Sequence, residues 1–412
     1  MSRFRKSLGL VAAGALVAGG MLGASLGTTV AQDPSPVADG TPVMEGAPAL
    51  PAGCTVAASG LDNPRFVAVS DGIVYVSVAG SAGDEAIFAT AGEGTPAPAD
   101  PVTMYGPSGA VIAVNADGTV STVAGDLPSF TFGTEVVGPA GLDVANGVLY
   151  VATGGVGPAT GTVPPLEGRA AVWSIDLVSG EGTIVADLEA YEMDNNPDPH
   201  MIDADPYGLV VGTDGMVYVA DAGGNDILKV DPTTGEVSTL AVIPGLPGQA
   251  ENPTRGGALE IDPVPTGLAL APDGGLYVST LSGGPFIPGT AALLHVAMDG
   301  TVTTVASGLT MLGDVTVGPD GAIYVVTMSD NFIDPAGPAP GSIVRVNEDG
   351  TSTPVISGIP FPNSIAFDAD GNAYITAMVS VPAGTPASGM VLKCDAAAFA
   401  AAVASPEATP AG

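Results

Sequence analysis

The sequence predicts an all-β fold, a six-bladed β-propeller in which six four-stranded sheets form a ring. Three observations lead to this prediction. A pattern of short apolar runs separated by tight turns recurs six times between residues 54 and 395. The runs show no helical period. The last copy lacks a fourth run, and the start of the pattern can supply it.

The clearest copy of the pattern is 205–240. Its four β-type runs are 209–211, 216–219, 227–230 and 237–240. Asp214-Gly215 separates the first two runs, and this dipeptide is typical of a type I′ hairpin turn, which needs φ > 0 at both central residues. One such sheet cannot bury its own faces, so the copies must pack against one another.

The other five copies carry the same turn and tyrosine signals. Their turns are Asp71-Gly72, Asn146-Gly147, Asp273-Gly274, Asp320-Gly321 and Asp370-Gly371. Six of the nine tyrosines occupy one equivalent position: Tyr75, Tyr150, Tyr218, Tyr277, Tyr324 and Tyr374. Because a blade of this type needs about 40–50 residues, the wider spacings predict loop insertions.

The two ends of the pattern are complementary. The sixth copy has a third run at 390–393 but no fourth, and 55–61 matches the fourth run of the fifth copy at 354–359. We therefore expect the N-terminal strand to complete the last blade and close the ring. Cys54 and Cys394 lie where the missing turn would be, and in an exported protein such a pair predicts a disulfide. A metal site and two free thiols are the alternatives.

The flanking segments differ in composition from the repeats. Residues 1–31 combine a basic start with an uncharged run of small apolar residues and predict a secretory signal peptide; a retained membrane anchor is the alternative. Residues 32–53 form a Pro/Ala/Gly-rich linker, 54–395 the propeller, and 396–412 an Ala-rich segment with a disordered tail. We expect a secreted or cell-envelope protein without a transmembrane segment in the mature chain.

The chain is strongly acidic, with 43 Asp and Glu against nine Lys and Arg and a formal net charge of −34. Such a chain repels nucleic acid and anionic membranes, which excludes both as partners. The charge suits cations or simply solubility. We expect a monomer.

The loop insertions predict which face of the ring carries function. In a propeller the first-to-second and third-to-fourth turns share one face, and here these turns are tight. The insertions therefore fall on the opposite face, at 81–107, 154–168, 282–290, 329–340 and 381–388 within blades and at 189–204 and 245–263 between blades. Binding residues are commonly found on loops held by a rigid scaffold.

Polar residues mark the channel mouth on that face, where the first strand of each blade begins. They are Asn63, Arg65, Asp205, Tyr207, Thr266, Asp314, Asn363 and Ser364, with Ala140 at the equivalent position of the second blade. Asn63, Asp205, Asp314 and Asn363 offer hard oxygen ligands for one Ca²⁺ or other divalent cation, and a carboxylate there can act as a general base. The alternative is that these residues make turns and bind only water.

The two histidines limit the metal chemistry. His200 and Asp203 lie in the acidic loop 195–205 and are secondary site candidates, with a solvated His200 as the alternative; His295 lies on an expected strand and is assigned a structural role. Two histidines cannot build a His-rich cluster, which disfavours a copper oxidase or a His-ligated zinc enzyme. No catalytic residue is identified.

Several stretches resemble the ScyD/ScyE family of exported bacterial propellers. The matching stretches are 59–65 (SGLDNPR), 205–208 (DPYG), 219–226 (VADAGGND), 264–267 (VPTG) and 283–286 (GGPF). The resemblance implies a propeller and export rather than a defined reaction. The blade pattern is also similar to NHL and gluconolactonase/regucalcin propellers, but the metal-ligand Glu of the latter has no clear match here.

These observations favour an exported propeller that binds a small ligand or a protein partner on its loop-bearing face, without catalysis. The alternative is a divalent-metal-dependent hydrolase, a lactonase or an enzyme of pigment metabolism with its site at the channel mouth. A purely structural role in the envelope is the third hypothesis.

Overall fold

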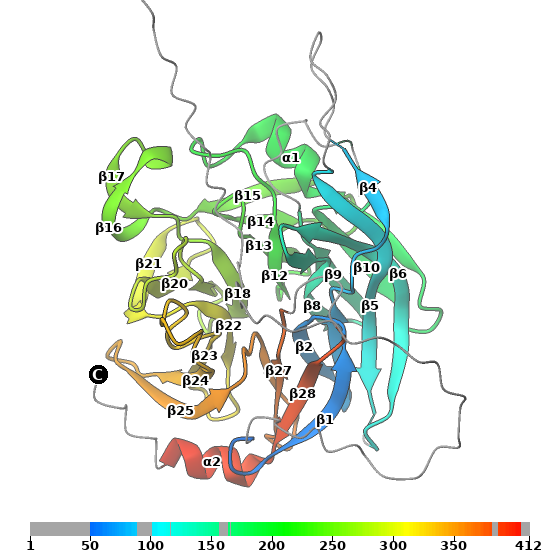
Figure 1. The fold of residues 1–412 in the computed structure, drawn as a ribbon, viewed down its shortest axis with the longest axis vertical. Helices are drawn as coiled ribbons and strands as arrows, with labels where there is room; N and C mark the ends of the chain where they lie inside the picture. Colours follow the sequence, from blue (N-terminus) through cyan, green and yellow to red (C-terminus); the bar gives the residue numbers. More distant parts are fainter. Residues whose placement is uncertain are drawn as a thin grey trace, which may run out of the picture.

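The computed structural model describes residues 50–88, 101–115, 117–155, 164, 166–380 and 386–404. The predicted signal peptide, most of the predicted linker and the tail after residue 404 lie outside these residues. The described chain forms the six blades that the repeats predict, arranged as a β-propeller. Figure 1 looks into the ring, with the inner strands of the blades around its centre.

Each blade is an antiparallel sheet whose first strand is innermost. The first blade consists of β2 (Pro64–Ser70), β3 (Ile73–Val78), β5 (Thr103–Val114) and β6 (Val120–Phe132). The second consists of β8 (Pro139–Ala145), β9 (Val148–Thr153), β10 (Ala171–Asp176) and β11 (Gly182–Asp187). The third consists of β12 (Pro206–Val211), β13 (Val217–Asp221), β14 (Asp226–Val230) and β15 (Val237–Val242). The fourth and fifth are β18 (Pro265–Leu270), β19 (Leu276–Thr280), β20 (Ala291–Val296) and β21 (Val302–Leu309), and β22 (Leu312–Val317), β23 (Ile323–Thr327), β24 (Gly341–Val346) and β25 (Ser352–Ile359).

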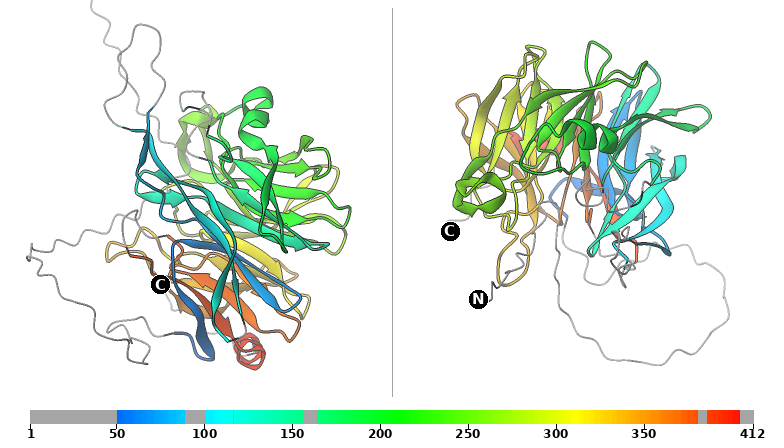
Figure 2. Two further views of the ribbon diagram at one scale, coloured as in Figure 1. Left: turned by 90° about the vertical axis from the view of Figure 1, so that its right-hand side faces the viewer. Right: turned by 90° about the horizontal axis from the view of Figure 1, so that it is seen from above.

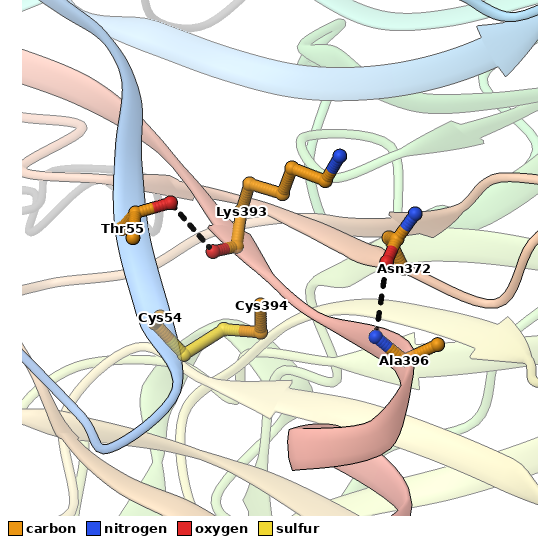
Figure 3. Close-up of a disulfide and its surroundings, with 6 residues drawn as sticks. All are labelled: Cys54, Thr55, Asn372, Lys393, Cys394 and Ala396. Carbon is orange, nitrogen blue, oxygen red and sulfur yellow. Dashed lines mark hydrogen bonds between the residues drawn. A yellow bond between two sulfur atoms is a disulfide. The ribbon is translucent and has the colours of Figure 1, made fainter.

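The sixth blade closes the ring with a strand from the other end of the described chain. Its order is β26 (Ile365–Phe367), β27 (Ala373–Ala377), β28 (Gly389–Cys394) and β1 (Cys54–Leu61), so the N-terminal strand is the outer strand of the last blade, as predicted. Cys54 lies opposite Cys394 in the register, and the two form a disulfide. Figure 3 shows this bond beside the Thr55–Lys393 contact of the same strand pair.

The core lies between neighbouring blades rather than within any one of them. In one apolar cluster Tyr218 and Ile227 of the third blade pack with Leu276 and Leu294 of the fourth. The helix α2 (Ala396–Ala404) follows β28, and its Phe399 packs with Tyr324 and Phe367. In the left view of Figure 2 the two ends of the described chain, blue β1 and red α2, lie together at this closing blade.

The hairpin positions are as predicted, but the type I′ geometry is present at only two of the repeated turns. Asp71-Gly72 and Asn146-Gly147 have positive φ at both residues. At Asp214-Gly215, Asp273-Gly274, Asp320-Gly321 and Asp370-Gly371 only the glycine has positive φ. The prediction of type I′ turns is therefore wrong at these four, which are longer turns that end on a left-handed glycine, as in the bond from Gly215 N to Gly212 O.

The insertions carry additional elements that the repeat pattern does not predict. They are β4 (Glu85–Ile87) paired with β5, β7 (Glu135–Val137) paired with β6, the hairpin of β16 (Leu246–Asn252) and β17 (Ala258–Ile261) with the turn η1 (Pro253–Arg255), and α1 (Leu188–Asn195). The α1 helix begins where the Asp187 carboxylate accepts from Ala190 N, and it ends at the left-handed Asn196. Neither helix of the described chain has the length and hydrophobicity of a membrane span.

Candidate functional site

A pocket opens at the channel mouth on the loop-bearing face. Its lining comes from the beginnings of first strands, from the segments that directly follow second strands, and from the additional strand β7. The lining residues are Arg65, Glu135, Val137, Gly138, Ala140, Gly154, Asp205, Tyr207, Ala222, Val264, Thr266, Leu281 and Met328. The empty volume is about 580 Å³, including the part that is open to solvent.

Arg65 and Glu135 form a buried ion pair in this pocket. Arg65 Nη2 donates to Glu135 Oε1 at 3.1 Å and to the Val136 carbonyl oxygen at 2.5 Å. Both side chains are less than a tenth exposed. Arg65 Nη1 is buried without a hydrogen-bond partner among the described residues. The N–H donors of this nitrogen are therefore unused. A buried donor without a partner is costly, and a ligand oxygen can supply the missing bond.

Asp205 supplies a carboxyl group that titrates near neutrality. Its Oδ1 accepts from Gly155 N at 2.9 Å, and its backbone N–H donates to Asp221 Oδ1 at 2.7 Å. Burial outweighs the Gly155 bond and the nearby Arg65 charge and raises the pKa of Asp205 to about 7. Near pH 7 the group can therefore both donate and accept a proton.

Tyr207 spans the channel from the third blade to the sixth. Its hydroxyl donates to Asn363 Oδ1 at 2.7 Å, and Asn363 Nδ2 donates to the Arg65 carbonyl oxygen at 3.0 Å. Burial and the neighbouring carboxylates hold the pKa of Tyr207 above its ordinary value, although Arg65 opposes them. Phe66 packs edge-on against the Tyr207 ring, with 5.3 Å between the centroids. Tyr207 is thus a fixed neutral donor.

The side chains of the remaining mouth residues mostly form hydrogen bonds within the propeller. Asn63 Nδ2 donates to the Gly80 carbonyl oxygen at 2.9 Å. Asp314 accepts from the Ser364 hydroxyl at 2.7 Å, which joins the fifth blade to the sixth. Thr266 lines the pocket and also donates to the Leu312 carbonyl oxygen at 2.9 Å. The structure therefore brings Arg65, Asp205 and Tyr207 together in the pocket, with Asn363 adjoining Tyr207, while Asn63 and Asp314 do not line it.

The secondary candidates lie on the loop 196–205, outside the pocket lining. His200 is exposed, with Nδ1 3.1 Å from the Thr254 carbonyl oxygen of η1. Asp203 is 4% exposed. Burial, followed by the charges of Asp205, Asp221 and Glu192, raises the pKa of Asp203 well above its ordinary value. The two residues do not form a pair.

Sequence reasoning missed Glu135, the partner of Arg65. It lies on β7, an additional strand after the long β6, and no other repeat has a counterpart at this position. The only signal was indirect, because an arginine at a channel mouth requires a nearby carboxylate when it is buried.

The channel mouth does not fit a divalent cation. The Arg65 guanidinium stands in the pocket, and a fixed positive charge there repels a second cation. Asn63 and Asp314, two of the four proposed oxygen ligands, direct their side chains to other partners.

Comparison with known proteins gives one partial family match. The model of the SMP-30/gluconolactonase/LRE-like region matches residues 265–387, which is less than half of the chain. No curated protein matches the sequence significantly.

Several solved structures are similar to the chain. Virginiamycin B lyase from Staphylococcus aureus, in a catalytically inactive form with quinupristin, is 16% identical over 77% of each chain, with a TM-score of 0.43. A putative oxidoreductase (glucose dehydrogenase) from Thermus thermophilus is 18% identical over 82% of this chain and 99% of its own, with a TM-score of 0.48. A gluconolactonase from Xanthomonas campestris is 15% identical over 85% of this chain and 99% of its own, with a TM-score of 0.43.

Proposed function

We propose that this chain is an exported propeller that binds a small, uncharged, oxygen-rich molecule, such as a sugar or a lactone, in the channel-mouth pocket. The observation that carries the proposal is the convergence of Arg65, Glu135, Asp205 and Tyr207 on one pocket. Val137, Ala222, Val264, Leu281 and Met328 supply apolar walls around these four residues. A few convergent polar groups in an apolar pocket are typical of small-molecule sites.

The donors and acceptors of the pocket favour this ligand class. Arg65 offers donors from Nη1, which suit carbonyl, ring and hydroxyl oxygens. Asp205 can accept from a hydroxyl when ionised and donate to an oxygen when protonated. Arg65 and Glu135 already neutralise each other, so a ligand with a full charge would be buried without a free counter-charge when Asp205 is neutral. The partial match to the SMP-30/gluconolactonase region also supports a sugar-derived ligand, and that region supplies Thr266, Leu281 and Met328 to the pocket.

Export is supported by two features. The stretches at 59–65 and 219–226 resemble ScyD/ScyE propellers, a family of exported proteins. The disulfide between Cys54 and Cys394 suits an oxidising compartment.

Ligand binding is tested by calorimetric titration of the full chain with monosaccharides, aldonolactones and the corresponding aldonic acids. We expect the neutral compounds to bind and the acids to bind at least tenfold more weakly at pH 8. An Arg65→Lys variant keeps the charge but loses the planar fork of donors, so affinity should fall at least tenfold. An Asp143→Asn variant is the matched control, because Asp143 lies on the inner strand β8 but bonds Val211 N instead of lining the pocket. The proposal is overturned if no compound binds, or if the acids bind best.

A second candidate function is hydrolysis of a lactone bound in the same pocket, and the pKa of Asp205 near 7 favours it. Ionised Asp205 would take a proton from water as the water oxygen bonds to the lactone carbonyl carbon. Arg65 would stabilise the resulting oxyanion. The bond from that carbon to the ring oxygen then breaks, and the ring oxygen takes up the proton to give the hydroxy acid. An Asp205→Asn variant should then bind the lactone but lose hydrolysis, whereas a binding protein shows no rate above background in either form.

A further inference from the structure

A second group of buried carboxyls lies next to the pocket, where the loop 196–205 packs against the turn between β13 and β14. Asp221 ends β13 and Asp226 begins β14, and the two lie directly opposite each other in the antiparallel register. Both are 0% exposed. Side chains of such a pair share one face of the sheet at contact distance, and like charges there are destabilising.

Asp221 is held in one orientation by backbone donors. Its Oδ1 accepts from Asp205 N at 2.7 Å, from Gly224 N at 3.0 Å and from Gly223 N at 3.1 Å. Its Oδ2 is buried without a partner among the described residues. The fixed Oδ1 therefore leaves Oδ2 as an acceptor with nothing to accept from.

Asp226 has no hydrogen bond at all from its carboxyl group within the described chain. Both Oδ1 and Oδ2 are buried and unpartnered. A fully buried carboxylate without donors costs several kcal/mol. The position therefore demands a proton or a cation.

Two further carboxyls come from the preceding insertion. Glu192 of α1 is 2% exposed and Asp203 of the loop is 4% exposed. The negative charges of Asp221 and Glu192 disfavour ionisation of both Asp226 and Asp203, and so raise the pKa of each. The insertion thus packs acid against acid, a contact that repels unless positive charge lies between the two segments.

The buried arginines of this region are engaged elsewhere. Arg255 pairs with Asp198 at 3.1 Å and with Asp262 at 2.6 Å. Arg169 pairs with Glu189 while its Nη1 is buried without a partner among the described residues, and it affects Asp203 only as a nearby charge. Within the described residues, no salt bridge reaches Asp221 or Asp226 from a basic side chain.

A glycine, with no side chain of its own, lies directly against these oxygens. A Cβ at Gly224 would lie 3.4 Å from the Asp203 carbonyl oxygen, 3.6 Å from Asp221 Oδ2 and 3.3 Å from Asp221 Cγ. Any other side chain at position 224 would press against the Asp203 carbonyl oxygen and the Asp221 carboxyl group.

We propose that this chain holds one Ca²⁺ ion between the carboxylates of Asp221 and Asp226, under the loop 196–205. Carboxylate and carbonyl oxygens are hard ligands, and Ca²⁺ accepts six to eight of them in irregular geometry. Asp226 supplies two oxygens and Asp221 Oδ2 one. Since the described carboxyls do not form a metal-ligand group of three, the Asp203 carbonyl oxygen and water complete the shell.

The ion would replace protons at this position. Binding of the cation therefore releases protons and tightens as pH rises. Because Asp221 also bonds the backbone N–H of Asp205, the ion would fasten the insertion to the third blade at the edge of the pocket.

The test is a calorimetric titration of the full chain with CaCl₂ at pH 7.5, after dialysis against EDTA, with thermal unfolding in parallel. We expect one Ca²⁺ per chain and a melting temperature that rises with Ca²⁺ concentration. Asp226→Asn keeps the shape of a protonated aspartate but removes the charge, so its Ca²⁺ affinity should fall at least tenfold. Asp221→Asn serves as the second variant if Asp226→Asn does not fold.

Two controls separate this site from the pocket and from general effects of charge. Asp143→Asn, whose carboxylate already bonds Val144 N and Val211 N, should keep the Ca²⁺ response in full. Arg65→Lys should also keep the Ca²⁺ response while it weakens the binding of pocket ligands, so the two proposals can fail separately. The Ca²⁺ site is overturned if the wild-type chain shows neither heat of binding nor a thermal shift. In that case Asp221 and Asp226 share a proton instead of a cation. The site is also overturned if Asp221→Asn and Asp226→Asn both bind Ca²⁺ as tightly as the wild-type chain does.

Discussion

Asp314 is a buried carboxyl group whose pKa makes folding depend on pH. Its Oδ2 accepts from the Ser364 hydroxyl, and its Oδ1 accepts from Val315 N at 2.8 Å. Burial outweighs these bonds and raises the pKa of Asp314 from 3.8 to about 7. The folded state therefore binds this proton more tightly than the unfolded state does.

The sign of the pH dependence follows from that difference. Between pH 4 and 7 the folded state carries more protons, so this residue's stabilising contribution is complete below about pH 4 and is lost as pH rises through 7. The loss is on the order of 4 kcal/mol at most. An Asp314→Asn variant has no proton to lose, so its stability relative to wild type should improve from pH 5 to pH 8. Urea unfolding of both proteins at the two pH values measures this, and a constant difference would contradict it.

At the residue scale, the repeat alignment could place the pocket side chains but not their partners. Arg65, Asp205 and Tyr207 begin inner strands, so their position at the channel mouth follows from the blade pattern. Glu135 could not be found in this way, because β7 belongs to no repeat. The direction of the Asp314 carboxylate also depends on the contact between two blades, which a single repeat does not contain.

At the element scale, the repeated tyrosine of the third and fifth blades bonds to the turn before its own strand. Tyr324 donates to Asp320 Oδ2 at 2.9 Å, and Tyr218 donates to Asp214 Oδ2 at the same distance. The other carboxylate oxygen of each aspartate accepts from the backbone N–H two residues later; for example, Ala322 N donates to Asp320 Oδ1. The hydroxyl thus fastens a strand to its own hairpin turn.

Removal of one such hydroxyl should destabilise the fold by an amount typical of one hydrogen bond. A Tyr324→Phe variant should lose about 1 kcal/mol, because the ring stays packed and only the bond to Asp320 is lost. Tyr150→Phe is the matched control, since the turn before its strand carries Asn146 in place of an aspartate. Guanidinium unfolding measures both, and equal losses in the two variants would argue against a role for the turn aspartate.

The sequence predicted where hairpins occur but not their geometry, for a local reason. At Asp320 and Asp273 the preceding residue is proline, whose fixed φ favours the second position of a type I turn. The aspartate then takes the third position with negative φ, and only the following glycine is left-handed. Asp71-Gly72, with Ser70 before it, keeps the two-residue form.

At the scale of the whole molecule, the number of blades and the closure could be predicted because both are repeated or complementary patterns. The positions of the insertions could be predicted but their secondary structure could not, because α1 and the β16–β17 hairpin have no second copy to compare. The α1 helix has no strong apolar face, and it is held by its Asp187 cap and by Tyr191, whose hydroxyl lies 2.9 Å from Thr239 Oγ1. Single contacts of this kind leave no period in a sequence.

Ring closure depends on both a strand pair and a covalent bond, and the two can be separated. The β1 strand pairs with β28 along its length, and the disulfide joins Cys54 to Cys394 across 340 positions. Linking such distant positions restricts the unfolded chain strongly, which is worth up to about 5 kcal/mol in the chain-entropy model. A Cys54→Ala/Cys394→Ala variant should keep the blade but unfold at a clearly lower guanidinium concentration without reductant.

Reductant provides the control for this comparison. Dithiothreitol, added after unfolding and before refolding, should bring the wild-type midpoint down to that of the double variant, and it should leave the double variant unchanged. The strand pairing remains in both, so the two should still give the same circular dichroism spectrum when folded. Equal midpoints without reductant would mean that β1 alone closes the ring, because the covalent bond would then add nothing that the β1–β28 hydrogen bonds and the packing of α2 do not already supply.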